Sequence, residues 1–333
     1  MMQFRNMGKD GAKISAIGVG AMSFSNFYGP TDEGQSHAIL DAALELGVSH
    51  IDTSNIYGMG KSEEAIGTFL AARPGAREQF HIATKGGITR DADGNRYYDN
   101  SLAHLEAELD KSLTRMGIDC VDLMYIHRRQ ADMPIEEAAG NLAALVKKGK
   151  ARGIGFSEIA PSSLRRAAAE HPVAAVQSEY SLSTRAPELG LVQACAELGT
   201  ALVAFSPVGR SLLTDHPLAK EAVAELPFLS GNPRFMEPNL SANLEITDRF
   251  RALAAEMGAP AAAVAIAWLL HRGEHVIPIP GTRSVEHFRE LVAGCGLALT
   301  EADMARIEQV LPVGWAHGDR YNEGQWVGPE RFC

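Results

Sequence analysis

Cysteine is scarce in this chain, and its four occurrences lie far apart. Cys120, Cys195, Cys295 and Cys333 share none of the short spacings that mark a zinc site or a redox motif. We therefore expect four reduced thiols, as in a cytosolic protein, and no metal site.

A surplus of basic residues is also missing. The formal net charge is −10 at pH 7, and the sequence pI is about 5.6. General affinity for nucleic acid or for an anionic membrane requires a basic face. The composition therefore argues against both as partners, and any site for a polyanion must be local.

Long apolar runs are absent as well. The N-terminal segment MMQFRNMGKDGAK lacks the apolar run of a signal peptide, and the most apolar stretch, AAAVAIAWLL at 261–270, is too short to span a bilayer. We expect a cytoplasmic protein without a membrane-spanning segment.

No low-complexity tract, charge block or flexible linker divides the chain, so we expect a single domain over residues 1–333. Short apolar runs recur along it and alternate with segments of helical periodicity. The runs lie at 17–19, 50–52, 81–85, 121–127, 151–157, 174–177, 201–206 and 276–280. Stripes of apolar residues between them, for example at 38–46, 102–116 and 285–291, predict helices.

Eight strand–helix units in one undivided chain indicate a (β/α)₈ TIM barrel, because parallel strands need helical crossovers and eight such units close on themselves. Residues 2–15 read as an N-terminal β-hairpin, and the material after residue 300 as extra C-terminal helices and loops. A doubly wound open sheet is the alternative. It is disfavoured because IGVGAM, after the first run, lacks the third glycine of a dinucleotide-binding fingerprint and opens no helix.

Three titratable residues terminate consecutive predicted strands. They are Asp52, Lys85 and His127, and Tyr57 follows in the loop after Asp52. The C-terminal ends of barrel strands converge on one face, where active sites are built. An ammonium beside a tyrosine stabilises the phenolate and favours its use as a general acid. Asp52 would hold Lys85 charged, and neutral His127 would donate to a substrate carbonyl oxygen.

Each of these residues also has an ordinary structural interpretation. Taken alone, Asp52 would be a cap or turn residue and Lys85 a solvated strand end. Tyr57 would be a half-buried packing ring, and His127 a core histidine. Their joint position at the ends of neighbouring strands favours a site.

The second half of the chain supplies a complementary set of residues. Gly281, Thr282 and Arg283 follow the last strand and precede a helix, an arrangement suited to an anion. Ser157, Gln177 and Phe205 end three further strands, where polar groups and an aromatic face suit a flat ring such as nicotinamide. A capped surface helix and a core aromatic ring are the structural alternatives.

Seven motifs together resemble the aldo-keto reductase superfamily, in order and with ordinary spacing from about residue 4 to residue 310. They are IDTSNIYG, ATKGG, DLMYIHR, GFSE, VQSEYS, FSPVGR and IPGTRS. The segment GDRYN at 318–322 further resembles a tail motif of the subgroup that includes auxin-induced-type and pyridoxal-reductase-type enzymes.

This resemblance implies a catalytic tetrad of Asp52, Tyr57, Lys85 and His127, with Tyr57 as the proton donor. It also implies bound NADPH, with NADH less favoured. Phe205 would stack on the nicotinamide, and Ser157 and Gln177 would lie near its carboxamide. The remaining implied cofactor contacts are Ser206, Val208 and Arg210 along the pyrophosphate, Gly281, Thr282 and Arg283 at the 2′-phosphate, and Glu290 beside the adenine contact.

Three positions depart from the family pattern. Glu158 stands where many members have asparagine beside the carboxamide, Leu291 replaces an asparagine that commonly follows Glu290, and His287 lies where many members have arginine. We therefore expect weaker cofactor binding and a less strict preference for NADPH.

The resemblance implies NADPH-dependent reduction of a small aldehyde or ketone. A Schiff-base lyase using Lys85 and a nicotinamide-binding regulatory subunit of a membrane channel, with slow turnover, are the alternatives. Met22, Tyr28 and Arg128, with the loop at 87–101, are candidate substrate contacts, although a solvated loop is the structural alternative. The sequence names neither the substrate nor the oligomeric state.

Overall fold

The computed structural model describes residues 2–91, 93–331 and 333. Eight parallel strands form one sheet in the order β12-β11-β10-β9-β8-β5-β4-β3, so each pairs with its neighbour along the chain. They are β3 (Val19–Gly20), β4 (His50–Asp52), β5 (His81–Gly86), β8 (Leu123–Ile126), β9 (Ile154–Ser157), β10 (Val173–Glu179), β11 (Ala201–Phe205) and β12 (Val276–Pro278).

Backbone hydrogen bonds close this sheet into a barrel. Gly18 N donates to Pro278 O, and Gly20 N donates to Pro280 O, each at 2.9 Å. A Cβ atom on Gly20 would lie 2.5 Å from Ile279 O, so the approach of the first strand to the last requires glycine here. The predicted (β/α)₈ architecture is thereby confirmed.

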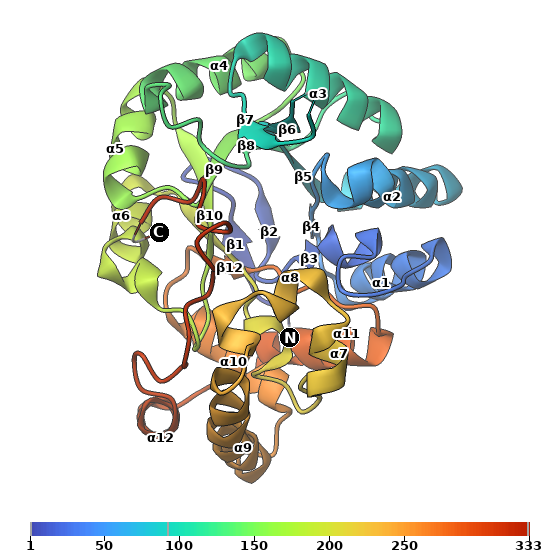
Figure 1. Cartoon of the computed structure of the whole chain (residues 1–333). Coiled ribbons are helices and arrows are strands. Elements are labelled where there is room, and N and C mark those ends of the chain that lie inside the picture. Colours follow the sequence, from blue (N-terminus) through green and yellow to red (C-terminus); the bar gives the residue numbers. More distant parts are fainter. Residues whose placement is uncertain (1, 92, 332) are drawn as a thin grey trace.

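Helices surround the strands, as Figure 1 shows, and eight of them follow the eight strands of the barrel along the chain. In α3, Ser101 caps the N-terminus by accepting from His104 N, and Leu105, Leu109 and Met116 are buried at the spacings that the sequence stripe predicted. The eight are α1 (Glu33–Leu46), α2 (Lys61–Ala72), α3 (Leu102–Met116), α4 (Ile135–Lys147), α5 (Pro161–Glu170), α6 (Leu191–Leu198), α10 (Ala261–His271) and α11 (Val285–Ala293).

The apolar core has two layers. One lies between the sheet and the helices, and the other fills the barrel interior. The predicted N-terminal hairpin, β1 (Phe4–Asn6) and β2 (Lys13–Ser15), contributes Met7 and Ile14 to the interior layer, where they join Tyr125 and smaller strand residues. The hairpin therefore closes the end at which the strands begin, and the functional face is the opposite end.

Two further segments lie at the end of the barrel where the strands end. The long connection after β11 contains η5 (Gly209–Ser211), α7 (Lys220–Ala224), α8 (Pro227–Ser230), η6 (Pro233–Phe235) and α9 (Asn239–Glu256). After η7 (Gly294–Gly296) and α12 (Glu301–Val310), the C-terminal tail, described for residues 311–331 and 333, runs back towards β9 and β10, where Glu330 N donates to Glu158 O at 2.9 Å.

The segment after β5, expected as a loop, is partly a hairpin: β6 (Ile88–Arg90) pairs antiparallel with β7 (Arg96–Tyr98). Four short turns complete the described elements: η1 (Ala21–Ser25), η2 (Tyr57–Gly60), η3 (Arg77–Gln79) and η4 (Ala186–Leu189). In the described part of the chain no single helix is long and apolar enough to cross a membrane; only α9 and α10, bent by 87°, meet that test when combined.

Candidate active site

A cavity of about 870 Å³ opens at the C-terminal ends of the strands. Most of the residues singled out from the sequence line it: Asp52, Tyr57, His127, Ser157, Gln177, Phe205, Ser206, Val208, Arg210, Gly281, Thr282, Arg283, Met22, Tyr28 and Arg128. Lys85 lies beneath this lining and reaches the cavity through its contact with Tyr57.

The Lys85 ammonium is held by three oxygen acceptors. Its Nζ donates to Asp52 Oδ1, to Thr53 O at 2.8 Å and to the Tyr57 hydroxyl at 3.4 Å. The other oxygen of Asp52 accepts from Gln177 Nε2 at 2.8 Å. Lys85 and Asp52 are each 1% exposed, so the ion pair is sealed from solvent and points the ammonium at the tyrosine.

The ring of His127 lies against Tyr57. Their centroids are 5.8 Å apart with an interplanar angle of 81°, an edge-to-face contact. Ser54 Oγ lies 3.1 Å from His127 Nδ1, so this hydroxyl fixes the ring orientation. The strands therefore bring the four predicted catalytic side chains together, and Ser54, which the sequence analysis missed, joins them.

Burial sets the protonation states of this group. It raises the pKa of Tyr57 above 10.0, although Lys85 opposes that shift, so the net direction is opposite to the one expected from the sequence. Burial alone would lower the pKa of Lys85, but Asp52 and Tyr57 outweigh it and raise that pKa above 10.5. Tyr57 is thus a neutral phenol beside a fixed ammonium.

The imidazole of His127 is neutral at physiological pH. Burial, followed by the positive charges of Arg128, Lys85 and Arg96, holds its pKa well below 6.5. A neutral imidazole can donate one hydrogen bond and accept another, as the sequence analysis expected.

The loop after β11 has an uncommon backbone. Ser206, Arg210 and Ser211 have φ values of 49°, 53° and 83°, although none is glycine. Such strain persists where surrounding structure enforces it, often at ligand sites. Ser206, Val208 and Arg210 present this strained loop to the cavity, beside Phe205 at the end of β11.

The turn before α11 forms the far end of the cavity. Ser284 caps the helix by accepting from His287 N at 3.2 Å, and Arg283 Nη1 donates to Pro30 O at 2.7 Å. Glu286, one residue into the helix, accepts from Ser284 Oγ at 2.9 Å and places a carboxylate near this turn.

Two positions named from the family pattern lie away from the cavity lining. Glu290 lies nearly one turn beyond His287 along α11 and is not among the residues that line the cavity, so its implied cofactor contact stays a prediction. Leu291 is 3% exposed and packs into the outer core, because it lies on the barrel-facing side of the helix.

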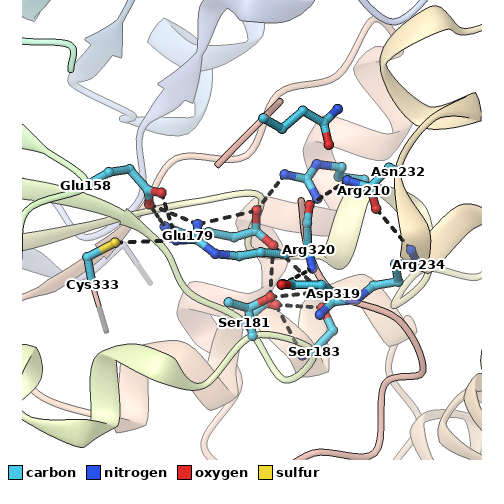
Figure 2. Close-up of polar contacts among 12 residues, drawn as sticks. Glu158, Glu179, Ser181, Ser183, Arg210, Asn232, Arg234, Asp319, Arg320 and Cys333 are labelled. Atoms are coloured by element: carbon cyan, nitrogen blue, oxygen red, sulfur yellow. Dashed lines mark hydrogen bonds and ion pairs between the residues drawn. The ribbon is translucent and has the colours of Figure 1, made fainter. Parts of the chain in front are cut away.

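Glu158 belongs to a buried ionic cluster, shown in Figure 2. The cluster consists of Glu158, Glu179, Arg210, Arg234 and Arg320, all less than 10% exposed. Arg320 donates to Glu158 Oε1 at 3.0 Å, and Arg210 donates to Glu179 Oε2 at 2.5 Å. Glu158 therefore pairs with Arg320 of the C-terminal tail and does not line the cavity.

The tail contributes directly to the site. Tyr321, Gln325 and Val327 line the cavity, and Tyr98 and Arg96 of the hairpin donate to tail carbonyls. No periodicity marks these tail residues; Tyr321 lies in the GDRYN segment that resembles a family tail motif, and Gln325 and Val327 lie beyond it. Ile88 and Arg96, from the loop at 87–101 that was a candidate substrate contact, also line the cavity, as do Phe27, Ile56, Leu218, Phe228 and Ile279, which were not assigned to the site from the sequence.

Comparison with known proteins agrees with this geometry. The pattern of the Aldo/keto reductase family matches residues 16–312. The aldo-keto reductase yakc [NADP(+)] of Schizosaccharomyces pombe is 36% identical over 324 residues, covering 96% of this chain and 94% of that protein. The probable aldo-keto reductase 1 of Glycine max is 35% identical over 319 residues, covering 96% and 91%.

Solved structures give the same result. Glycerol dehydrogenase AKR11B4 from Gluconobacter oxydans superposes with a TM-score of 0.80 at 27% identity, covering 92% of this chain and 94% of that one. The holo form of aldo-keto reductase AKR11C1 from Bacillus halodurans gives 0.77 at 25%, covering 98% and 100%. From its sequence match, its relatives and its barrel, this chain belongs to the aldo/keto reductase family.

Proposed function

We propose that this protein reduces an aldehyde or ketone to the alcohol with NADPH, and that Tyr57 is the proton donor. The observation that carries the proposal is the contact of the buried Lys85 ammonium with the Tyr57 hydroxyl at 3.4 Å, beside a neutral His127. The relative from Schizosaccharomyces pombe is named for NADP(+), and this supports the choice of cofactor.

The residues around the cavity fit a dinucleotide. The cavity extends from Tyr57 to the turn at Arg283, and three buried arginines in the cluster share only two carboxylates, which suits a bound pyrophosphate. Arg210 Nε is buried without a hydrogen-bond partner among the described residues, and Arg210 lines the cavity.

We assign Ser206, Val208 and Arg210 to the pyrophosphate, and Gly281, Thr282 and Arg283 to the 2′-phosphate. Phe205, Ser157 and Gln177 are the proposed contacts of the nicotinamide end. Bound NADPH supplies hydride to the carbonyl carbon.

The side chains supply the proton and hold the carbonyl. Tyr57 donates its hydroxyl proton to the carbonyl oxygen, and the Lys85 ammonium stabilises the phenolate that remains. If Ser54 Oγ donates to His127 Nδ1, the ring proton lies on Nε2, which then donates to the same oxygen. Asp52 keeps Lys85 charged throughout, and a charged amine is not the nucleophile that a Schiff-base lyase requires.

Loss of NADPH absorbance with a panel of aldehydes and ketones tests the function. We expect many turnovers per enzyme molecule and no covalent adduct on borohydride treatment without nicotinamide. A reaction that stops after one turnover would favour the regulatory-subunit alternative, and trapping on Lys85 would favour the lyase.

The pKa shifts predict a broad pH plateau for reduction. Tyr57 acts in its protonated form, and its raised pKa keeps it protonated up to at least pH 10. His127 acts in its neutral form, and its lowered pKa keeps it neutral down to below pH 6.5. We expect kcat/KM for the carbonyl compound to be flat between these limits and to fall only outside them. A decline on the acidic side that begins at neutral pH would contradict the assignment to His127.

Replacing Arg283 by alanine should separate the two nicotinamide cofactors. Because the guanidinium would pair with a phosphate that NADH lacks, we expect the Kd for NADPH to rise about tenfold and that for NADH to change by less than about twofold. Quenching of tryptophan fluorescence measures both. Arg289→Ala is the control, since Arg289 lies in α11, the helix that follows this turn, but pairs with Glu45 outside the cavity lining. Equal losses for NADPH and NADH would refute the assignment.

A further inference from the structure

Positive charge is in excess around the cavity. Of the described residues that line it, four are arginines and one, Asp52, is a carboxylate, already paired with Lys85. Arg210 pairs with Glu179, and Arg283 is assigned above to the cofactor. Arg96 and Arg128 remain, and both lie at the end of the cavity that holds His127.

Arg128 is half-buried and directly follows His127 at the end of β8. Its Nη1 donates to His127 O at 2.6 Å and to Ser157 Oγ at 3.0 Å, which fixes the guanidinium in place. In the described part of the chain, no carboxylate pairs with it and no acceptor bonds its Nε or Nη2. These two nitrogens form one edge of the guanidinium, with parallel N–H groups that match the two oxygens of a carboxylate.

Arg96 adds a second cation at the rim. It projects from β7, lines the cavity and donates through Nη2 to Gly324 O of the tail at 3.2 Å. Neither Arg96 nor Arg128 forms an ion pair with any described residue, yet both charges act on the ring of His127. Two unpaired cations near one partly desolvated ring repel each other, and a bound anion would relieve that repulsion.

We propose that the carbonyl substrate carries a carboxylate, which the free edge of Arg128 binds side-on while Arg96 adds attraction at the rim. This inference rests on the proposed function, because it takes the carbonyl to lie between Tyr57 and His127. It narrows the substrate to small oxo acids, in which a carboxylate lies a few bonds from the aldehyde or ketone.

Matched acid and ester substrates test the proposal. We would measure kcat/KM with NADPH for 2-, 3- and 4-carboxybenzaldehyde and for the methyl ester of each. The ester keeps the ring and the aldehyde and removes only the negative charge. For at least one isomer we expect the acid to be preferred about tenfold or more. An acid-to-ester ratio of one or less for all three isomers would overturn the proposal.

Variants of Arg128 test whether this residue causes the preference for the acid over its ester. Arg128→Gln should lower the acid-to-ester ratio at least about fivefold, and Arg128→Lys, which keeps the charge but loses the fork, should give an intermediate ratio. Arg90→Gln is the control, because Arg90 shares the β6–β7 hairpin with Arg96, bonds only Gly94 O among the described residues and does not line the cavity. Equal losses on acid and ester in Arg128→Gln would assign this residue to another role and refute the proposal.

Two further measurements distinguish a carboxylate from a phosphate as the anionic group of the substrate. Competitive inhibition by benzoate but not by benzamide should be present in the wild type and weakened in Arg128→Gln. The ratio of kcat/KM for glyceraldehyde 3-phosphate to that for glyceraldehyde can be compared with the acid-to-ester ratios. If the phosphate ratio exceeded every acid-to-ester ratio, the anionic group bound by Arg128 would be a phosphate and the carboxylate proposal would be wrong. If esters are reduced as fast as acids, the reductase function stands and only this inference fails; if no carbonyl compound is reduced, both fail.

Discussion

Tyr57→Phe should lose about 10²–10⁴-fold in kcat/KM for carbonyl reduction, the range typical of a missing general acid. The variant removes the hydroxyl that contacts the Lys85 ammonium and keeps the ring that packs edge-to-face on His127. The fold and the cofactor contacts should therefore persist. Steady-state kinetics with one good aldehyde, together with NADPH binding by fluorescence, would measure both properties.

Tyr97→Phe is the matched control for this experiment. Tyr97 is 46% exposed on β7 and does not line the cavity, so loss of its hydroxyl should leave kcat/KM unchanged. If Tyr57→Phe retained activity within about threefold of the wild type, another group would have to protonate the product.

Arg320→Met should destabilise the protein by about 3–5 kcal/mol, the cost typical of breaking a buried ion pair by removing one partner. Arg320 is 3% exposed and binds Glu158, which is 0% exposed and has no other cation among the described residues. Methionine would fill much of the space but leave the Glu158 carboxylate buried and unpaired. Urea unfolding followed by circular dichroism would measure the change.

Two comparisons make this result specific. Arg306→Met removes an ion pair to Glu256 that is largely exposed, and such pairs contribute less than about 1 kcal/mol. The double variant Arg320→Met with Glu158→Gln should recover part of the loss, because it removes the unpaired charge. Equal destabilisation by Arg320→Met and Arg306→Met would show that burial does not govern the strength of the Arg320 pair.

Repeating patterns in the sequence predicted the barrel. Each strand is a short apolar run, each helix follows with its own apolar stripe, and parallel pairing places strand ends on one face. For that reason the sequence alone predicts that Asp52, Lys85 and His127 share one site. Family resemblance, and not periodicity, supplied the cofactor and the division of roles.

Contacts between distant parts of the chain escaped prediction. Tyr321 reaches the cavity because Arg320 binds carboxylates at the ends of β9 and β10, and nothing local in the tail records that pairing. The sequence predicts a lowered pKa for Tyr57, because it places the Lys85 ammonium near this side chain and a positive charge stabilises the phenolate. The degree of burial, which outweighs that charge, depends on packing from several elements.

Closure of the barrel also bears on how the chain folds. The seam joins Gly18 and Gly20 to Pro278 and Pro280, so it pairs segments from near the two ends of the chain. Pairings of such high contact order form late, after the loop entropy of the intervening chain has been overcome. Until then β3 and β12 are unpaired edges that can capture another molecule. Refolding yield should therefore fall as protein concentration rises, with aggregation as the competing process.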